Sequence, residues 1–204
     1  MIKTRFIILR KTPYQDSGLI LAGISPEAGR VDLMVKGARS IGAKKFPVCE
    51  LFRELQIQFK EPSGGSNLAS PKSLEALSSF DGVASKPESY LKACEQAAFF
   101  LKHSRPMLEA QASYTAFRCM LMRLSEGATP IHIAAALAKL AFLHEAGLLP
   151  DKLSDDSRAG RESNLLAELL AAACEGPLPK LSEGYWQRLA DWIESLASYH
   201  GLNS

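Results

Sequence analysis

The spacing of apolar residues changes once along the chain, near residue 80, and this change most limits the folds available. Before it, short apolar segments alternate with polar residues or are separated by Gly, Pro and Ser, as in strands and turns. After residue 86, apolar residues recur with the spacing of one helix face. We therefore predict an α+β chain in two parts, a β domain over residues 1–80 and an all-α helical domain over residues 81–204.

The N-terminal part contains five predicted strands, near residues 6–9, 19–24, 31–35, 55–59 and 68–77. Val31, Leu33 and Val35 alternate with Asp32, Met34 and Lys36, which is the period of a half-buried strand. We expect turns at Thr12-Pro13 and at residues 25–29. Five short strands joined by turns favour a small closed barrel.

The C-terminal part contains five predicted helices. The first has an apolar stripe made of Tyr90, Cys94, Ala97, Ala98 and Leu101. The second covers about residues 107–126. The third has Thr129 as its N-cap and ends at Gly147, and the last two cover 162–174 and the residues after Pro179.

The charge of the chain is divided unevenly along its length. Its 204 residues have a net charge of +2, but residues 1–61 carry eleven basic and six acidic residues, a net +5, and the remainder has a net −3. Such a division predicts a polyanionic partner for the N-terminal part. The alternative is the ordinary fluctuation of charge between the two halves of a protein.

A basic segment, residues 36–45, follows the third predicted strand. It contains Lys36, Arg39, Lys44 and Lys45 and no acidic residue. Gly37 and Gly42 let its backbone approach a ligand. Single-strand binders combine such cations with aromatic rings, and Tyr14 is a further aromatic that could stack on a base or cap the barrel. We predict that DNA is bound by Arg10, Lys11, Arg30, Lys36, Arg39, Lys44, Lys45 and Phe46.

Two arginines border an apolar stripe in the second predicted helix. Arg118 and Arg123 flank the side chains of Phe117, Met120 and Leu121. An apolar groove with arginines at its rim would bind a short acidic and hydrophobic peptide tail. The alternative is a core helix with solvated arginines.

No catalytic, metal-binding or membrane signature is present in the sequence. The four cysteines form no close pair, and His144-Glu145 lacks the second histidine of a metalloprotease motif. The segment 37–42 continues without the Lys-Ser/Thr of a phosphate loop. We therefore predict a cytoplasmic protein that is not an enzyme, that has no cofactor or metal and that does not contact membranes.

Several segments together resemble the bacterial RecO family of recombination mediators. They are Ile7-Ile8-Leu9-Arg10, Tyr14-Gln15-Asp16-Ser17-Gly18, Gly29-Arg30-Val31, Lys36-Gly37-Ala38-Arg39-Ser40 and the helix end at residues 142–151. Gly18 stands where the family more often has Asp. Many relatives also carry a four-cysteine zinc module, whereas residues 151–164 contain no cysteine, so we expect no zinc.

The resemblance implies a five-stranded OB-fold barrel followed by the helical domain. It also implies binding of single- and double-stranded DNA, annealing of complementary strands, contact with RecR and with the C-terminal tail of single-stranded-DNA-binding protein (SSB), and help in loading recombinase onto SSB-coated DNA. A nucleoid-associated protein in the cytoplasm is then expected. The alternative function is a protein-interaction scaffold whose barrel has little affinity for DNA.

Overall fold

The computed structural model describes residues 1–39, 49–61, 68–150 and 159–203. The backbone falls into two compact units. Unit 1 consists of Met1–Asp81 and Ala97–Tyr114, and unit 2 of Gly82–Gln96 and Thr115–Ser204. The domain boundary that the sequence places at residue 80 stays a prediction.

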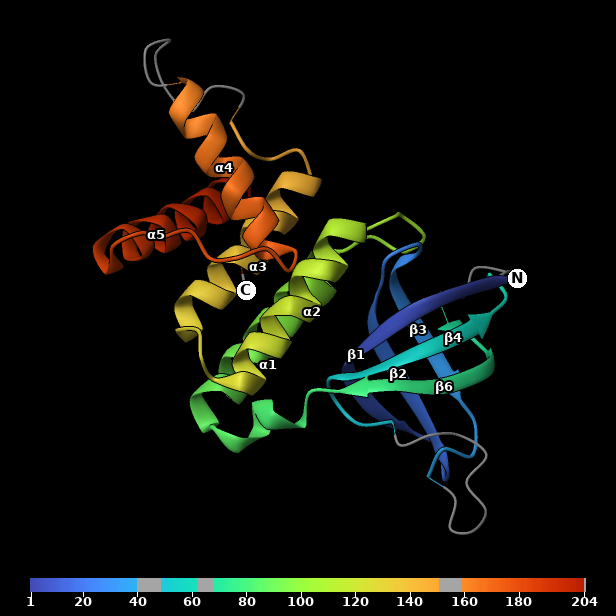
Figure 1. The fold of residues 1–204 in the computed structure, drawn as a ribbon. Helices are drawn as coiled ribbons and strands as arrows, with labels where there is room; N and C mark the ends of the chain where they lie inside the picture. The colour runs from blue at the N-terminus through green and yellow to red at the C-terminus, as the bar shows by residue number, and fades with distance from the viewer. Residues whose placement is uncertain (40–48, 62–67, 151–158, 204) are drawn as a thin grey trace. The chain divides into compact units, whose positions relative to one another are not determined.

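Unit 1 is built on a mixed six-stranded sheet in the order β5-β3-β2-β1-β4-β6 (Figure 1). All neighbouring strands are antiparallel except β3 and β5. The strands are β1 (Ile2–Tyr14), β2 (Gly18–Ser25), β3 (Gly29–Val35), β4 (Arg53–Phe59), β5 (Leu68–Ala69) and β6 (Pro71–Ser79).

The α+β class is confirmed, but the predicted closed barrel of five strands is wrong. The sheet is open between β5 and β6 in the part of the chain that the structure describes. The predicted fifth strand is divided at Ser70, so β5 pairs with β3 and β6 pairs with β4. The residue after this break is Pro71, which has no N–H to donate to a ladder.

The turn predicted at Thr12-Pro13 is also displaced. β1 continues to Tyr14, with Pro13 opposite Leu19, and the chain turns at residues 15–17. β4 pairs only with the first half of β1, from Ile2 to Ile7. Among the strands that the structure describes, residues 10–14 of β1 pair with β2 alone, and a proline is tolerated at such an edge.

One face of the sheet, the inner face, covers the main core of unit 1. Val31, Leu33 and Val35 are at most 4% exposed and the residues between them are half-buried, which confirms the predicted alternation. Phe6, Leu55, Ile57 and Phe59 are fully buried with them, and Leu21 packs in the same cluster. The polar side chains between these positions lie on the opposite, outer face.

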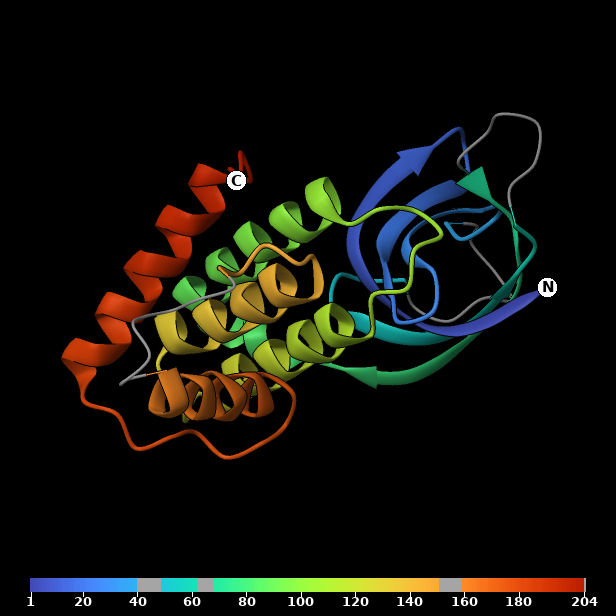
Figure 2. The same cartoon turned by 90° about the horizontal axis from the view of Figure 1, so that it is seen from above.

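Unit 2 is helical, although three of its helices begin or end in unit 1. The short 3-10 helix η1 (Asp81–Ser85) is followed by α1 (Pro87–His103), α2 (Gln111–Glu126), α3 (Ile131–Glu145), α4 (Ala159–Ala173) and α5 (Glu183–Tyr199). α3 packs against both α4 and α5, and Figure 2 shows α3 and α4 side by side in yellow-orange and orange. Leu140, Leu143, Ala172 and Ile193 are fully buried in their common core.

Three predictions about the helices are corrected. Of the predicted stripe on α1, Ala97 and Leu101 are buried but Ala98 is exposed, and the buried face also includes Ser89, Ala93 and Gln96. Two of these buried residues are polar, so an apolar pattern cannot find them. α2 begins at Gln111 rather than near residue 107.

The N-cap of α3 is the third correction. The N-cap residue is Pro130 and makes no side-chain cap bond, so Thr129 is not the cap. The predicted end of this helix is confirmed. Gly147 has φ +68°, and the Leu148 N–H donates to the Leu143 carbonyl at 2.9 Å.

Candidate nucleic-acid interface

The tip of the β1–β2 hairpin and the adjoining end of β3 present a continuous outer surface. The strand register aligns Arg10 with Ala22 and Asp32, aligns Thr12 with Ile20 and Met34, and places Tyr14 opposite Gly18. Residues opposite one another on neighbouring strands share a face of the sheet. We call this surface the Tyr14 face; it consists of Arg10, Thr12, Tyr14, Ile20, Met34, Lys36 and Arg39.

Tyr14 is the aromatic residue of this face. Its side chain is 37% exposed. A Cβ atom at Gly18 would lie 2.7 Å from the Tyr14 carbonyl oxygen and 3.7 Å from Cδ1 of the ring. Gly18 therefore adds no side chain beside the ring, and an exposed ring can stack against a base.

Three exposed cations belong to the same face. Arg10 is on β1, and Lys36 and Arg39 are in the turn after β3. The Arg39 N–H donates to the Ser17 carbonyl at 2.9 Å, so this turn lies against the turn between β1 and β2. None of the three side chains forms an ion pair within the described ranges 1–39, 49–61, 68–150 and 159–203. Their charges are therefore available to a polyanion.

Two other predicted DNA contacts are paired inside unit 1. Lys11 forms an ion pair with Glu50. The Arg30 guanidinium donates to the Leu101 carbonyl at 2.9 Å and to Asp32 Oδ2 at 3.0 Å. Their positive charges are thus partly neutralised by the protein, and their role in DNA binding stays a prediction.

The remaining predicted residues of the basic segment, Lys44, Lys45 and Phe46, lie outside the described residues. The structure also adds basic residues that the sequence analysis did not select. Lys3 and Arg5 are exposed on the outer face of β1, opposite Gln58 and Gln56 of β4. The signal for them is the alternation of cations with Ile2 and Thr4, which predicts that both cations point to the same side of a strand.

Arg118 and Arg123 both contact residues at or just beyond the C-terminal end of α4. The Arg118 guanidinium lies 2.9 Å from the carboxylate of Glu175. Arg123 is only 9% exposed and donates to the carbonyls of Ala172 and Gly176 at 2.5 and 3.2 Å. Cations at this position satisfy helix carbonyls and oppose the negative end of the helix dipole. The partner-binding role predicted for these two arginines stays a prediction.

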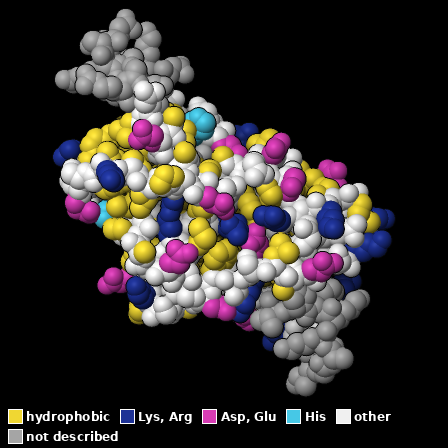
Figure 3. Space-filling model, in the orientation of Figure 1, with side chains coloured by type: hydrophobic (Ala, Val, Ile, Leu, Met, Phe, Trp, Pro, Cys, Tyr) yellow, Lys and Arg dark blue, Asp and Glu magenta, His cyan; other side chains and the backbone are white. Residues whose placement is uncertain are grey.

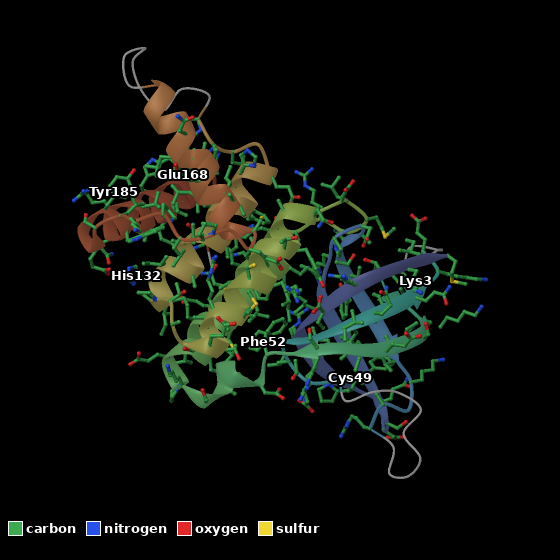
Figure 4. The ribbon with its side chains drawn as sticks, viewed as in Figure 1. Lys3, Cys49, Phe52, His132, Glu168 and Tyr185 are labelled. Carbon is green, nitrogen blue, oxygen red and sulfur yellow. The ribbon has the colours of Figure 1, made fainter. Side chains whose placement is uncertain are left out.

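An apolar groove does exist in unit 2, but it is formed by other residues. It has a volume of about 280 Å³ and lies between α3, α4 and α5. Tyr185, labelled in Figure 4, and Arg188 line it on α5, with the guanidinium carbon 5.9 Å from the ring centroid. The apolar lining consists of Leu140, Leu165, Leu166, Leu169, Leu189 and Trp192.

Cys49, Cys119 and Cys174 are poorly suited to nucleophilic chemistry. Burial raises the pKa of Cys49 and of Cys119 to about 11, and it raises the pKa of Cys174 as well. These thiols are therefore protonated near neutral pH and are weak nucleophiles and metal ligands. Within the described part of the chain, no three His, Cys, Asp or Glu side chains are grouped so that they could hold a metal ion.

None of the helices among the described residues is both long enough and apolar enough to cross a membrane.

An exposed aromatic residue that shares the outer face of a small sheet with cations free of ion pairs to the described residues is an arrangement typical of nucleic-acid-binding proteins. Residues 1–80 match the family model described as recombination protein O N terminal. The chain is also 28% identical over 151 residues to the DNA repair protein RecO of Alteromonas mediterranea, in a match that covers 72% of this chain and 61% of that relative. Both comparisons agree with the resemblance found in the sequence: residues 1–80 are similar to the N-terminal part of recombination protein O, and the chain spans less than two thirds of the length of the relative that it matches.

Proposed function

We propose that this chain is a DNA-binding recombination mediator in DNA repair. It would bind single- and double-stranded DNA, anneal complementary strands and help load recombinase onto SSB-coated DNA, together with RecR. The family match and the name of the relative support a role in repair. The sheet of unit 1 is then the counterpart of an OB-like domain, and the protein works at the nucleoid in the cytoplasm.

The observation that carries the proposal is the Tyr14 face. Arg10, Lys36 and Arg39 would neutralise phosphates and release their counterions, while the Tyr14 ring stacks on a base. Three phosphate contacts predict that log K falls with log salt with a slope of about −2 for a single strand. No base edge is read, so affinity depends little on sequence.

Reversing two charges of this face tests the proposal. We expect Arg10→Glu with Lys36→Glu to weaken binding of a labelled single-stranded oligonucleotide at least about tenfold, because two attractions become repulsions. Fluorescence anisotropy at low salt measures the affinity, and circular dichroism checks the fold. The matched control is Lys92→Glu with Lys180→Glu, which makes the same charge change in unit 2. Equal affinities of the two variants would contradict the role of the Tyr14 face.

The alternative is a protein-interaction scaffold with little affinity for DNA. The same titration of the unchanged protein separates the two functions, because a scaffold leaves the anisotropy of the oligonucleotide unchanged. Our proposal includes no catalysis. It is supported by the protonated state of the buried thiols and by the absence of catalytic motifs in the sequence.

The groove between α3, α4 and α5 supports a second activity within this proposal, the binding of a peptide tail. Its leucines and Trp192 offer an apolar floor and Arg188 offers one positive charge. A short tail that combines apolar and acidic residues matches both features. We therefore propose that the C-terminal tail of SSB binds here rather than at Arg118 and Arg123.

Arg188→Glu tests this assignment. We expect it to weaken binding of a labelled SSB tail peptide by about tenfold, since an attraction to a carboxylate becomes a repulsion. Lys180→Glu, which changes the same charge outside the groove lining, is the control. Anisotropy of the peptide gives the dissociation constant. Unchanged binding by the Arg188 variant would place the tail elsewhere.

A further inference from the structure

A second cationic surface lies at the other end of β1. Lys3 is aligned with Gln58 and Ser73, and Arg5 is aligned with Gln56 and Glu75, so these side chains share the outer face of β1, β4 and β6. Figure 3 shows several dark-blue Lys and Arg side chains together at the edge of the molecule where β1 begins. Figure 4 shows Lys3 at the end of the sheet far from Phe52.

Two more lysines are at the same corner of the sheet. Phe59 pairs with Ile2 on one side and with Pro71 on the other, and Lys60 and Lys72 directly follow Phe59 and Pro71. Both lysines are exposed, as are Lys3 and Arg5. We call this surface the β1–β4–β6 face; its members are Lys3, Arg5, Gln56, Gln58, Lys60 and Lys72.

The charges of this face are available to a ligand. None of its four cations forms an ion pair with any residue that the structure describes. The nearby acids are Glu61 and Glu75, so the four cations leave a net positive charge. The two glutamine amides can donate hydrogen bonds beside them. Cations with amide donors are the groups that contact phosphate and sugar oxygens.

A structural barrier separates this face from the Tyr14 face. Glu54, Ile7, Ile24 and Arg30 form one row across four strands of the outer face. The first three of these residues are at most 2% exposed.

The barrier is the segment Ala97–Tyr114 of the same unit. The Tyr114 hydroxyl donates to Glu54 Oε1 at 2.7 Å, and the Leu101 carbonyl accepts from the Arg30 guanidinium at 2.9 Å. This segment is therefore bonded to both ends of the row. A polynucleotide cannot follow the outer side of β1 from Arg5 to Arg10 without displacing it.

We propose that the β1–β4–β6 face is a second nucleic-acid backbone site, so that one chain holds two DNA strands at once on separate surfaces. The inference rests on the proposed DNA binding at the Tyr14 face. Each site neutralises the phosphates of its own strand, which reduces the repulsion between complementary strands before they pair. The named members of the β1–β4–β6 face include no aromatic residue that could stack on a base, so this site binds its strand more weakly than the Tyr14 face does. The Tyr14 face therefore sets the affinity at low DNA concentration, and the second site contributes chiefly to annealing by holding one further strand per chain.

The test uses Lys3→Glu with Arg5→Glu in the full chain. Site sizes for single strands run from about 4 to 16 nucleotides, so an oligonucleotide of about ten nucleotides occupies one face only. We expect the unchanged protein to bind two oligonucleotides per chain and the variant to bind one, with the affinity for that one within about twofold of the unchanged protein. We expect the rate of annealing of complementary labelled strands to fall at least about tenfold.

The control is again Lys92→Glu with Lys180→Glu, which should retain two bound oligonucleotides and the full annealing rate. Stoichiometric titration and fluorescence quenching measure the two quantities, and thermal melting checks folding. If the unchanged protein binds no oligonucleotide, the proposed function itself fails. If it binds DNA through Arg10 and Lys36 but the Lys3 and Arg5 variant keeps both its stoichiometry and its annealing rate, only the second site is overturned.

Discussion

Gly29→Ala is expected to reduce the free energy of unfolding by about 3 kcal/mol or more. Gly29 has φ +56°, a conformation that costs a residue with a Cβ about 1 kcal/mol. The added Cβ would also lie 2.4 Å from the carbonyl oxygens of both Arg105 and Leu108. To relieve this overlap, the segment around these residues must move away from the β2–β3 turn.

That movement breaks hydrogen bonds that hold unit 1 together. The Arg30 N–H donates to the Arg105 carbonyl at 3.2 Å and the Met107 N–H donates to the Ala28 carbonyl at 2.9 Å. Each such bond contributes about 1 kcal/mol net. The Gly29-Arg30 pair, one of the segments that resemble the RecO family, therefore has a packing role that its sequence alone does not show.

Gly147→Ala is the matched control for Gly29→Ala. Gly147 also has a positive φ, +68°, but no atom lies within 4 Å of a Cβ built there. The Gly147→Ala variant should lose only about 1 kcal/mol of unfolding free energy, which is the cost of a positive φ for a residue with a Cβ. Urea unfolding followed by circular dichroism measures the free energy of unfolding of both variants. Similar losses for the two variants would show that the contact with residues 105–108 does not stabilise the protein.

Glu194→Ala is expected to destabilise the protein by about 2–3 kcal/mol. Lys139 on α3 is 2% exposed, and its Nζ lies 2.6 and 2.7 Å from the two carboxylate oxygens of Glu194 on α5. Removing the carboxylate leaves a buried ammonium without this partner, which costs several kcal/mol in a dry interior. The side chain of Glu194 is 62% exposed, so water reaches the pair and reduces the loss.

Adding Lys139→Met to Glu194→Ala should recover most of that loss, because the apolar side chain fills the same space without a charge. The comparison of the single and double variants in urea unfolding isolates the cost of the Lys139 ammonium after its ion pair with Glu194 is lost. If the double variant is less stable than the single one, the ammonium makes favourable interactions beyond this ion pair. In that case the ion pair is not what fixes α3 against α5.

Local periodicity was sufficient to place most of the elements. The alternation along β3 depends on neighbouring residues only, so it could be read directly and agrees with the observed burial. The end of α3 at Gly147 follows from the conformation that glycine permits, which is also local. On α1 the pattern was right for Ala97 and Leu101, which are buried, but it included the exposed Ala98 and missed the buried polar residues Ser89 and Gln96.

The candidate sites, like the fold, could be predicted from the sequence only in part. The sequence by itself determined that the N-terminal part is a basic sheet and that the C-terminal part is helical, because period and composition are properties of neighbouring residues. Only the tertiary structure decided which cations remain available. Register and long-range contacts pair Arg30 with Asp32 and Leu101, put Arg10 on the same face of β1 as Tyr14, and place Lys3 and Arg5 on a separate surface. Such pairing depends on residues that are up to 71 positions apart, and no local pattern records it.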